Sequence, residues 1–402
     1  MDAQSIVAQL LTTEGRADPY PLYERALELG PAVPAGDGLL LVSGYEACRQ
    51  ALRSPALGAD INLVTWGADI SAHPSLALMS RTLLVANPPH HGRLRSSMSQ
   101  VFTARRVAAM EARVADLTDA LLDTVADAGS APVDFMDAVA FPLPAHVICD
   151  LLGVPVEDRE RFRDYATDLI GILELLADPS GLAAADRAAV ELHRYFTELA
   201  GRRRADPRDD LVTAMVRARD EGTLRDDEEL VANLASLLLA GFETTTYLLG
   251  NGLQTLFEHP GIMAGLRDGT VPVQGFVEEV LRHDSPVQTS NRAVLTDGVV
   301  VGGVPAPAGS HVVLLLGAAN RDPARYEQPD RFDPHRKDIQ PLSFGGGAHH
   351  CLGAMLARLE AVTVFSRLPT RFPDLRPAPG DGPVRRDRLV LRGHQSLPVV
   401  LT

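Results

Sequence analysis

A long helical pattern between residues 227 and 259 constrains the fold of this chain more than any other feature. Asp226 or Asp227 can cap its first turn, and Pro260 ends it. At 1.5 Å per residue, such a helix is about 48 Å long, which is enough to cross a whole domain. Its centre, LASLLLAGF, is apolar on every side. A helix that is apolar all round is buried, so the rest of the chain must fold around this one.

The remaining pattern is also mainly helical. Apolar positions recur at spacings of three and four residues, whereas only a few short β-branched or leucine-rich runs read as strands. The sequence therefore predicts a mainly α fold with a smaller β part. We expect one domain over residues 1–402, with a helix-rich lobe and a small β-rich lobe, because no linker or repeat divides the chain. The predicted helices are 105–128, 141–153, 157–176, 184–204 and 227–259, and the predicted strands are 39–42, 294–303, 311–316, 389–391 and 397–402.

Composition excludes several classes of protein. The formal net charge is −14, which argues against nucleic acid as the partner. Three cysteines in 402 residues do not form a disulfide framework, so a reducing compartment is the simpler interpretation. The N-terminus lacks a basic segment followed by an apolar run, and nowhere do 18 uncharged apolar residues run together. We therefore expect a cytoplasmic protein without a membrane span.

The segment FGGGAHHCLGA, residues 344–354, surrounds one cysteine with four glycines and two histidines. Four interpretations apply to Cys351: a structural zinc site, a nucleophilic thiol, a buried structural thiol or a thiolate ligand of haem iron. Zinc sites usually take four ligands, often from Cys-x-x-Cys pairs, and the chain has no such pair. A nucleophile needs a base, which His349 or His350 could supply. Neither a nucleophile nor a buried thiol explains the glycines.

A thiolate beneath a flat macrocycle does explain them, because glycine lets the backbone approach a ring closely. The predicted helix after Cys351 also points its free N–H groups at the sulfur, which stabilises a thiolate. The fixed positions Phe344, Gly345, Gly347, His349, Cys351 and Gly353 resemble the haem-binding loop of the cytochromes P450. This resemblance implies that Cys351 is the axial ligand of the iron of haem b. It also implies that Phe344, Gly345 and Gly353 lie against the haem.

Two other motifs are similar to those of the same family. Ala240-Gly241-Phe242-Glu243-Thr244 resembles the oxygen-activation motif A-G-x-[DE]-T of the long helix. In the family, Ala240 and Gly241 lie at the haem face, and Glu243 and Thr244 are the catalytic pair that delivers protons. Glu279 and Arg282 match the motif E-x-x-R, and Arg336 in PDRFDPHR fits a later arginine that joins them. The resemblance implies a structural role for these three residues in holding the cysteine loop.

The resemblance also implies contacts with the haem propionates and with substrate. NPPHHGRLR, residues 87–95, is similar to D-P-P-x-H-x-x-x-R, although Asn87 replaces the usual aspartate. Positively charged hydrogen-bond donors pair well with carboxylates. The implied propionate partners are His91, Arg95, Arg292 and His349. Candidate substrate contacts are Leu237, Gln288, Thr289 and Trp66, and packing is an equally good interpretation of Trp66.

The implied activity is a haem-thiolate monooxygenase that inserts one oxygen atom of O2 into an organic substrate by hydroxylation or epoxidation. Its two electrons come from NAD(P)H through a separate ferredoxin or flavodoxin and its reductase, because no G-x-G-x-x-G opens a helix after a strand here. Such partners are acidic, so a basic patch from Arg95, Arg105, Arg106, Lys337 and Arg358 is one docking hypothesis.

The resemblance to bacterial members of the family suggests that the enzyme modifies a secondary metabolite such as a polyketide, as in antibiotic biosynthesis. The substrate is free or bound to a carrier protein. Two alternatives remain. One is a peroxide-driven or rearranging haem-thiolate enzyme, and the other is a non-enzymatic haem-binding scaffold. Retention of Glu243, Thr244 and Cys351 argues against both.

Overall fold

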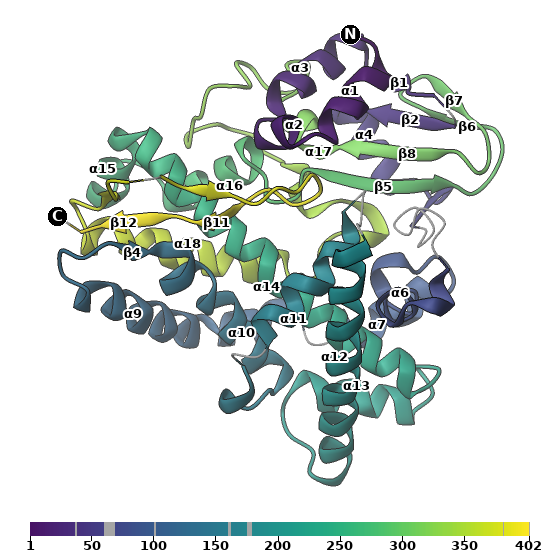
Figure 1. The fold of residues 1–402 in the computed structure, drawn as a ribbon, viewed down its shortest axis with the longest axis horizontal. Coiled ribbons are helices and arrows are strands. Elements are labelled where there is room, and N and C mark those ends of the chain that lie inside the picture. Colours follow the sequence, from purple (N-terminus) through teal and green to yellow (C-terminus); the bar gives the residue numbers. More distant parts are fainter. Residues whose placement is uncertain are drawn as a thin grey trace. The chain divides into compact units, whose positions relative to one another are not determined.

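Helices dominate the structure, a computed structural model that describes residues 1–36, 38–59, 69–99, 102–159, 162–174, 179–380 and 382–401 (Figure 1). The mainly α fold class with a smaller β part is confirmed. The chain divides into two compact units. The first comprises Met1–Leu57, Glu111–Leu143 and Thr244–Thr402, and the second comprises Gly58–Met110 and Pro144–Glu243. The single domain over residues 1–402 stays a prediction.

The largest sheet lies in the first unit and has the strand order β1-β2-β8-β5-β3. Strands β2 (Leu39–Val42) and β8 (His311–Leu315) are parallel, with Leu40 opposite Val312, and β5 (Thr289–Val294) pairs with β8 in the antiparallel sense (Figure 1). Their apolar side chains pack on α4 (Tyr45–Arg53) in one buried cluster. The flanking strands are β1 (Ala32–Pro34) and β3 (Leu57–Gly58).

Shorter strands complete the β part of the first unit. Strands β6 (Val299–Val301) and β7 (Val304–Ala306) form a hairpin, and β10 (Val384–Arg385) pairs with β11 (His394–Ser396). A three-stranded sheet has the order β4-β12-β9, from Val133–Asp134, Pro398–Val400 and Arg376–Pro377. The strand predicted over 294–303 is wrong in its bounds, since the turn after Val294 separates β5 from the hairpin. Residues 389–391 form one isolated bridge, Leu391 to Val287, instead of a strand.

Two helices of the first unit are joined by ion pairs. Helix α9 (Glu111–Asp127) packs on α18 (Ala354–Arg371), and the ion pairs Arg367–Asp119 and Arg371–Asp123 join them. Met110 separates α9 from α8 (Ala104–Ala109), so the single helix predicted over 105–128 is two helices. The helices are α1 (Ala3–Leu10), α2 (Thr13–Ala17), α3 (Tyr20–Leu29), α9 (Glu111–Asp127), α15 (Pro260–Asp268), α16 (Val273–His283), α17 (Leu316–Ala319) and α18 (Ala354–Arg371).

Among its described residues, the second unit is helical. Helix α12 packs on α6, α11 and α13, and Arg203 with Asp210 forms a buried ion pair of 2.5 Å between α12 and the start of α13. Helix α12 is longer and α11 shorter than the predicted 184–204 and 157–176. The helices are α6 (Pro74–Met79), α7 (His90–Ser99), α8 (Ala104–Ala109), α11 (Phe162–Ile170), α12 (Pro179–Ala205) and α13 (Leu211–Asp220).

Two helices begin in one unit and end in the other: α10 (Pro142–Leu152) and α14 (Asp227–Glu258). Helix α14 confirms the long predicted helix. The Asp226 side chain accepts a 2.7 Å hydrogen bond from the Glu229 N–H, so Asp226 is the capping residue. Among the described residues, none of the helices combines the length and apolar character that crossing a membrane requires.

Candidate active site

The segment that carries Cys351 is held in shape by backbone hydrogen bonds. The Cys351 N–H donates to the Phe344 carbonyl at 3.0 Å, and the His350 N–H donates to the Gly347 carbonyl at 3.2 Å. Gly345 and Gly347 have φ angles of 67° and 62°, which disfavour side chains. Gly346 and Gly353 have φ angles of −169° and −84°, which any residue can adopt. The backbone conformation of the turn therefore favours glycine at two of the four positions.

Gly347 has a second reason to lack a side chain. A Cβ on this residue would lie 2.5 Å from the Leu52 carbonyl oxygen and 2.9 Å from the Arg53 Cα, both backbone atoms at the end of α4. Real carbon atoms do not approach this closely. The cysteine segment is thus packed directly on α4, a contact that the sequence did not predict.

The three cysteines differ in their surroundings. Cys48 and Cys149 are buried, and burial raises the pKa of both thiols, that of Cys149 to about 12. They are structural thiols that stay protonated. Cys351 alone is exposed, just before the first turn of α18. An exposed sulfur at the start of a helix is the one suited to bind a metal as a thiolate.

One face of α14 is accessible in the middle of an otherwise buried stretch. From Glu229 to Leu253, every residue is buried except Ala240, which is exposed, and Gly241 and Thr244, which are half-buried. Ala240 and Thr244 are four residues apart and therefore share a helix face. Glu243, next to Thr244, is completely buried. The accessible face coincides with the predicted oxygen-activation motif.

Gly241 also serves local packing. A Cβ on Gly241 would lie 2.9 Å from the Ile148 Cδ1 atom of α10. The missing side chain therefore permits close contact between two helices, in addition to any role toward the haem. Leu237, one turn earlier on the predicted face, is 9% exposed and so contributes little accessible surface.

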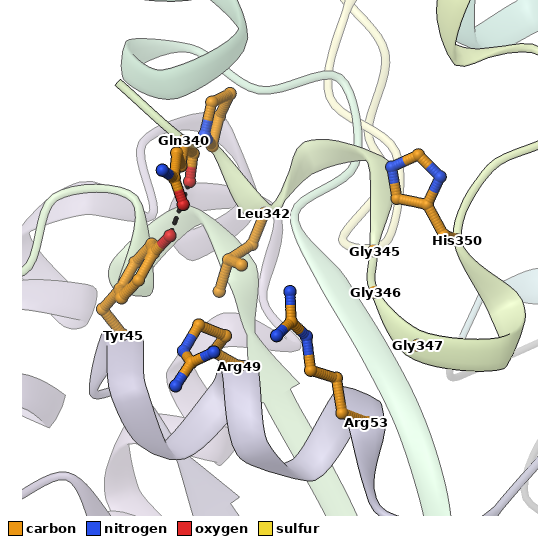
Figure 2. Close-up of a pocket in the computed structure, with 10 residues that line it drawn as sticks. Tyr45, Arg49, Arg53, Gln340, Leu342, Gly345, Gly346, Gly347 and His350 are labelled. Atoms are coloured by element: carbon orange, nitrogen blue, oxygen red, sulfur yellow. Dashed lines mark hydrogen bonds between the residues drawn. The ribbon is translucent and has the colours of Figure 1, made fainter. Parts of the chain in front are cut away.

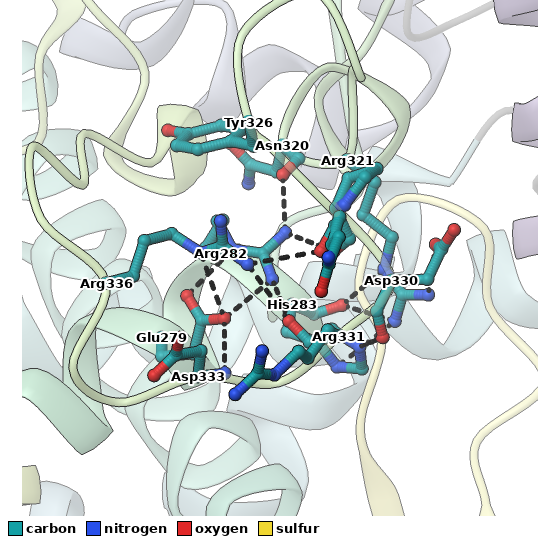
Figure 3. Close-up of polar contacts among 12 residues, drawn as sticks. Glu279, Arg282, His283, Asn320, Arg321, Tyr326, Asp330, Arg331, Asp333 and Arg336 are labelled. Atoms are coloured by element: carbon teal, nitrogen blue, oxygen red, sulfur yellow. Dashed lines mark hydrogen bonds and ion pairs between the residues drawn. The ribbon is translucent and has the colours of Figure 1, made fainter.

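Glu279, Arg282 and Arg336 meet as predicted, at the end of α16 (Figure 3). Arg282 donates to both carboxylate oxygens of Glu279 at 2.7 Å, and both side chains are fully buried. Arg336 Nε lies 3.4 Å from the same carboxylate, which also accepts from the Asp333 N–H at 2.9 Å. The three side chains therefore meet at one carboxylate, and removing a partner would leave an uncompensated buried charge.

Asn320 connects this centre to the cysteine segment. Arg282 Nη1 donates to the Asn320 carbonyl at 3.0 Å (Figure 3). The Asn320 side chain accepts from the Leu342 N–H at 2.7 Å and donates to the Ser343 hydroxyl at 3.1 Å. Leu342 and Ser343 lie directly before Phe344, which the glycines follow. The sequence offered no signal of this bridging role of Asn320.

Arg292 is a buried guanidinium with neutral partners. It is 8% exposed and donates to the Ser290 hydroxyl at 2.9 Å and the Asn291 carbonyl at 2.7 Å. In the described part of the chain, no carboxylate lies within ion-pair distance of it. Burial lowers the pKa of Arg292 to about 10, so the cation is still charged at neutral pH. Its environment suits an external carboxylate, as a haem propionate would provide.

In the second unit, His91 and Arg95 lie one turn apart on α7. His91 is buried, and burial, with the nearby charge of Arg95, lowers the pKa of its imidazole. The substitution at Asn87 has a structural reason. Its side-chain amide accepts from the Ala59 N–H at 3.0 Å and donates to the Ala59 carbonyl at 2.5 Å. An aspartate could accept but not donate.

The candidate substrate residues Gln288 and Thr289 lie at the start of β5. Gln288, just before the strand, is buried and donates to the Ser285 carbonyl at 2.7 Å and the Tyr20 hydroxyl at 3.5 Å. Its amide nitrogen is therefore engaged within the protein, whereas its amide oxygen Oε1 has no hydrogen-bond partner among the described residues. Thr289 is equally buried, and its hydroxyl has no hydrogen-bond partner within the described ranges. Trp66 lies outside the described residues.

Two arginines of the predicted basic patch form ion pairs with acidic residues of the chain. Arg358 pairs with Glu278 at 2.5 Å and lies over the Phe344 ring, while Arg106 pairs with Asp209 at 2.9 Å. Within the described ranges, no cluster of three or more His, Cys, Asp or Glu side chains could hold a metal ion. The multi-ligand zinc site considered for Cys351 therefore has no further ligands there.

Comparison with known proteins decides the family. The family model described as Cytochrome P450 matches residues 63–269 and 272–397. The chain belongs to the cytochrome P450 family. It is therefore placed among enzymes that carry haem b and act as monooxygenases with electrons that originate from NAD(P)H.

Individual relatives agree with this P450 assignment. Cytochrome P450 107B1 of Saccharopolyspora erythraea is 39% identical over 366 residues, which cover 89% of this chain and 88% of the relative. The 6-deoxyerythronolide B hydroxylase of the same organism is 37% identical over 408 residues, covering 98% and 99%. A solved structure of P450BioI in complex with hexadec-9Z-enoic acid ligated acyl carrier protein has a TM-score of 0.90 at 31% identity, covering 97% of this chain and 100% of that one.

The residues of this P450 fit its cofactor. The exposed thiol of Cys351 suits a soft thiolate bond to iron. The buried Arg292 lacks an acidic partner in the described chain, and the accessible strip of α14 consists of a small side chain, a glycine and a hydroxyl. A buried cation without an acidic partner and an accessible strip in a buried helix are otherwise unusual.

Proposed function

We propose that this P450 hydroxylates or epoxidises a bacterial secondary metabolite, such as a polyketide, with Cys351 as the axial ligand of the haem iron. The observation that carries the proposal is the accessible strip of Ala240, Gly241 and Thr244 beside the fully buried Glu243. When bound, the haem supplies the activation of O2 and the insertion of one oxygen atom into a C–H or C=C bond.

The residues of the chain have separate proposed roles. The Thr244 hydroxyl binds a water molecule or a proton at the accessible face of α14. Glu243, the preceding residue of the helix, supplies protons to Thr244. The apolar residues around them exclude bulk water, which limits loss of protons and oxygen to side reactions. Phe344, Gly345 and Gly353 give the cofactor a close apolar contact.

Cationic and imidazole donors are proposed to orient the cofactor. From the family resemblance, Arg292, His349, His91 and Arg95 are each proposed as partners of the propionates. Gln288 and Thr289 are both proposed as substrate contacts, because the Gln288 Oε1 atom and the Thr289 hydroxyl have no hydrogen-bond partner among the described residues.

The substrate class is supported by one relative named for the hydroxylation of 6-deoxyerythronolide B, a macrolide. A carrier-bound substrate has separate support, because the solved structure of P450BioI holds an acyl group on an acyl carrier protein. Electrons are proposed to arrive through a ferredoxin or flavodoxin with its reductase. A peroxide-driven enzyme and a non-enzymatic scaffold remain alternatives.

An absorption spectrum of the dithionite-reduced protein with carbon monoxide tests the ligand. We expect a strongly red-shifted Soret band that Cys351→Ala abolishes, whereas Cys149→Ala keeps it. Macrolide lactones and their carrier-bound precursors would then be screened by the spin-state shift of the bound haem. With a ferredoxin, its reductase and NADPH, O2 consumption must match product formation. Product with peroxide alone would favour the first alternative, and no product with any oxidant would favour the scaffold.

A further inference from the structure

Two groups of polar residues in the first unit have no role in the proposed reaction so far. One lines a pocket of about 500 Å³ between α4 and the cysteine segment, with Arg53 extending toward the glycines (Figure 2). That pocket belongs to the surface of the cysteine segment described above. The other group lies inside the unit, where the C-terminal segment, residues 385–394, packs against the second half of α14.

Beyond its accessible strip, α14 continues as a row of polar side chains. Thr244, Tyr247 and Asn251 are three and four residues apart, so they share one helix face. Tyr247 also follows Glu243 by four residues, about one turn. Tyr247 is 1% exposed and Asn251 is fully buried. These three residues, which we call the polar row, therefore lead from the accessible strip into the interior of the first unit.

The C-terminal segment packs closely on the polar row. Gly393 lies so near Tyr247 that a Cβ on this glycine would collide with the tyrosine ring. The Asn251 amide donates to the Arg392 carbonyl at 3.1 Å and to the Asp284 carbonyl at 3.0 Å. The backbone of this segment therefore excludes a bulky ligand from the polar row and leaves room only for small molecules.

Three buried polar atoms at this contact have no hydrogen-bond partner among the described residues: Asn251 Oδ1, His394 Nδ1 and Arg385 Nη1. His394 Nδ1 would be 3.5 Å from a Cβ on Gly250, the neighbour of Asn251. Arg385 is opposite His394 in the β10–β11 pair. Burial, with the nearby charge of Arg385, lowers the pKa of His394 to about 3, so its imidazole is neutral at pH 7. The three residues thus offer both donors and acceptors.

Such atoms point to bound water. Buried polar atoms are almost always hydrogen-bonded, to ordered water where the chain supplies no partner. A buried water makes about three hydrogen bonds, and the three atoms named above can supply them. The Arg385 side chain is 26% exposed and donates to Asp284 at 3.2 Å, so one end of the site is open to solvent.

We propose that this site holds buried water and that protons from solvent pass through it along the polar row to Thr244. The reaction takes up protons together with the electrons from NADPH and releases the second oxygen atom of O2 as water. Each proton passed toward Thr244 is replaced by one from the next group outward, so solvent is the net source. The Tyr247 hydroxyl accepts and donates at once, whereas Asn251 and His394 position the water. This inference rests on the proposed monooxygenase function.

The water can be observed without turnover. In a high-resolution crystal structure of the haem-loaded protein, we expect an ordered water within about 3 Å of both Asn251 Oδ1 and His394 Nδ1. His394→Leu should lose this water while keeping the carbon monoxide band of the wild type. A dry site in the wild-type crystal would overturn the inference, because the polar row would then have no source of protons.

Proton delivery can be measured with O2 as the probe and no organic substrate. A ferredoxin, its reductase and NADPH reduce O2 to hydrogen peroxide or, with further electrons and protons, to water. Tyr247→Phe removes only a hydroxyl and should lower the fraction of O2 reduced to water about tenfold, as should His394→Leu. His394→Gln keeps a group that binds water and should recover most of that fraction. Tyr195→Phe is the matched control, since the Tyr195 hydroxyl donates to Asp158 in the second unit.

A solvent isotope effect separates proton delivery from a merely structural role. O2 consumption in D2O should slow more in Tyr247→Phe than in wild type, because proton transfer then limits the rate. An unchanged fraction of water in both Tyr247→Phe and His394→Leu would overturn the inference, and so would an equal loss in Tyr195→Phe. Absence of the thiolate-type carbon monoxide band in wild type would instead reject the proposed function, whatever the crystal shows at Asn251.

Discussion

Glu279 and Arg282 form a bidentate ion pair with no solvent exposure on either side chain. Because they are three residues apart in α16, the helix itself brings them onto one face. The arginine also donates to the Pro329 carbonyl at 2.7 Å and the Asn320 carbonyl at 3.0 Å. One helix residue thereby fixes two distant loops.

Replacing Glu279 by Gln should destabilise the protein strongly. Arg282 would keep its buried charge without a carboxylate, and loss of one partner in such pairs costs about 3–5 kcal/mol. The free energy of unfolding in guanidinium chloride measures this. The control Glu28→Gln removes an exposed partner of Arg25 and should cost less than about 1 kcal/mol. Equal effects of the two substitutions would contradict the structural role of the pair.

Gly347→Ala should disturb the cysteine segment, whereas Gly346→Ala should be milder. The first places a Cβ 2.5 Å from the Leu52 carbonyl oxygen at a φ of 62°, and the second places one 3.3 Å from the Leu52 Cβ at an extended φ. Left-handed backbone alone costs about 1–2 kcal/mol for a side chain. We expect Gly347→Ala to lose most of its thiolate-type carbon monoxide band, measured per mole of protein. A normal band in this variant would show that the contact with α4 is dispensable.

Thr244→Ala and Glu243→Gln should separate electron use from product formation. The proposed proton path needs both groups, and loss of a positioned acid typically slows a proton-transfer step about 10²–10⁴-fold. NADPH consumption should continue in Thr244→Ala while hydrogen peroxide replaces product. Thr255→Ala is a control on the same helix, because its hydroxyl bonds to the Asn251 carbonyl at 2.8 Å. If both threonine variants stay fully coupled, Thr244 has no part in proton delivery.

Glu229 should make the protein sensitive to acid. Burial alone would raise its pKa, but hydrogen bonds from Arg93 and Arg225 lower it to about 2. A depressed folded-state pKa gives stability that is complete above the ordinary value, 4.5, and is lost as pH falls toward 2. Glu229→Gln should therefore lose about 3 kcal/mol at pH 6 and flatten the pH dependence between 4.5 and 2.

Guanidinium unfolding at pH 3 and pH 6 would test this prediction. Glu228→Gln removes the exposed neighbour and should keep the wild-type pH dependence. A Glu229→Gln variant with the same acid sensitivity as wild type would assign the titration to another carboxylate.

Local features of this P450 were predictable because they depend on residues close together in the chain. The length of α14 follows from an apolar period, a capping aspartate and a proline. The pairing of Glu279 with Arg282 follows from their spacing on a helix. The family-like segment around Cys351 identified the one cysteine that the structure leaves exposed.

Elsewhere no local pattern favoured one packing arrangement over another. The break at Met110 and the hairpin after Val294 depend on turns that periodicity does not encode. Only the structure shows that the Gln288 amide nitrogen is already bound, to Ser285 and Tyr20, while its amide oxygen and the Thr289 hydroxyl have no partner among the described residues.

The sequence by itself determined the fold class, the long buried helix and which residues are candidates for the chemistry. The tertiary structure decided which of those residues are accessible and what supports them. Leu52 touches Gly347, and Asn320 joins Arg282 to the cysteine segment, across long separations in the chain. Such contacts arise when packed elements exclude water and satisfy buried polar groups, so no local sequence pattern predicts them.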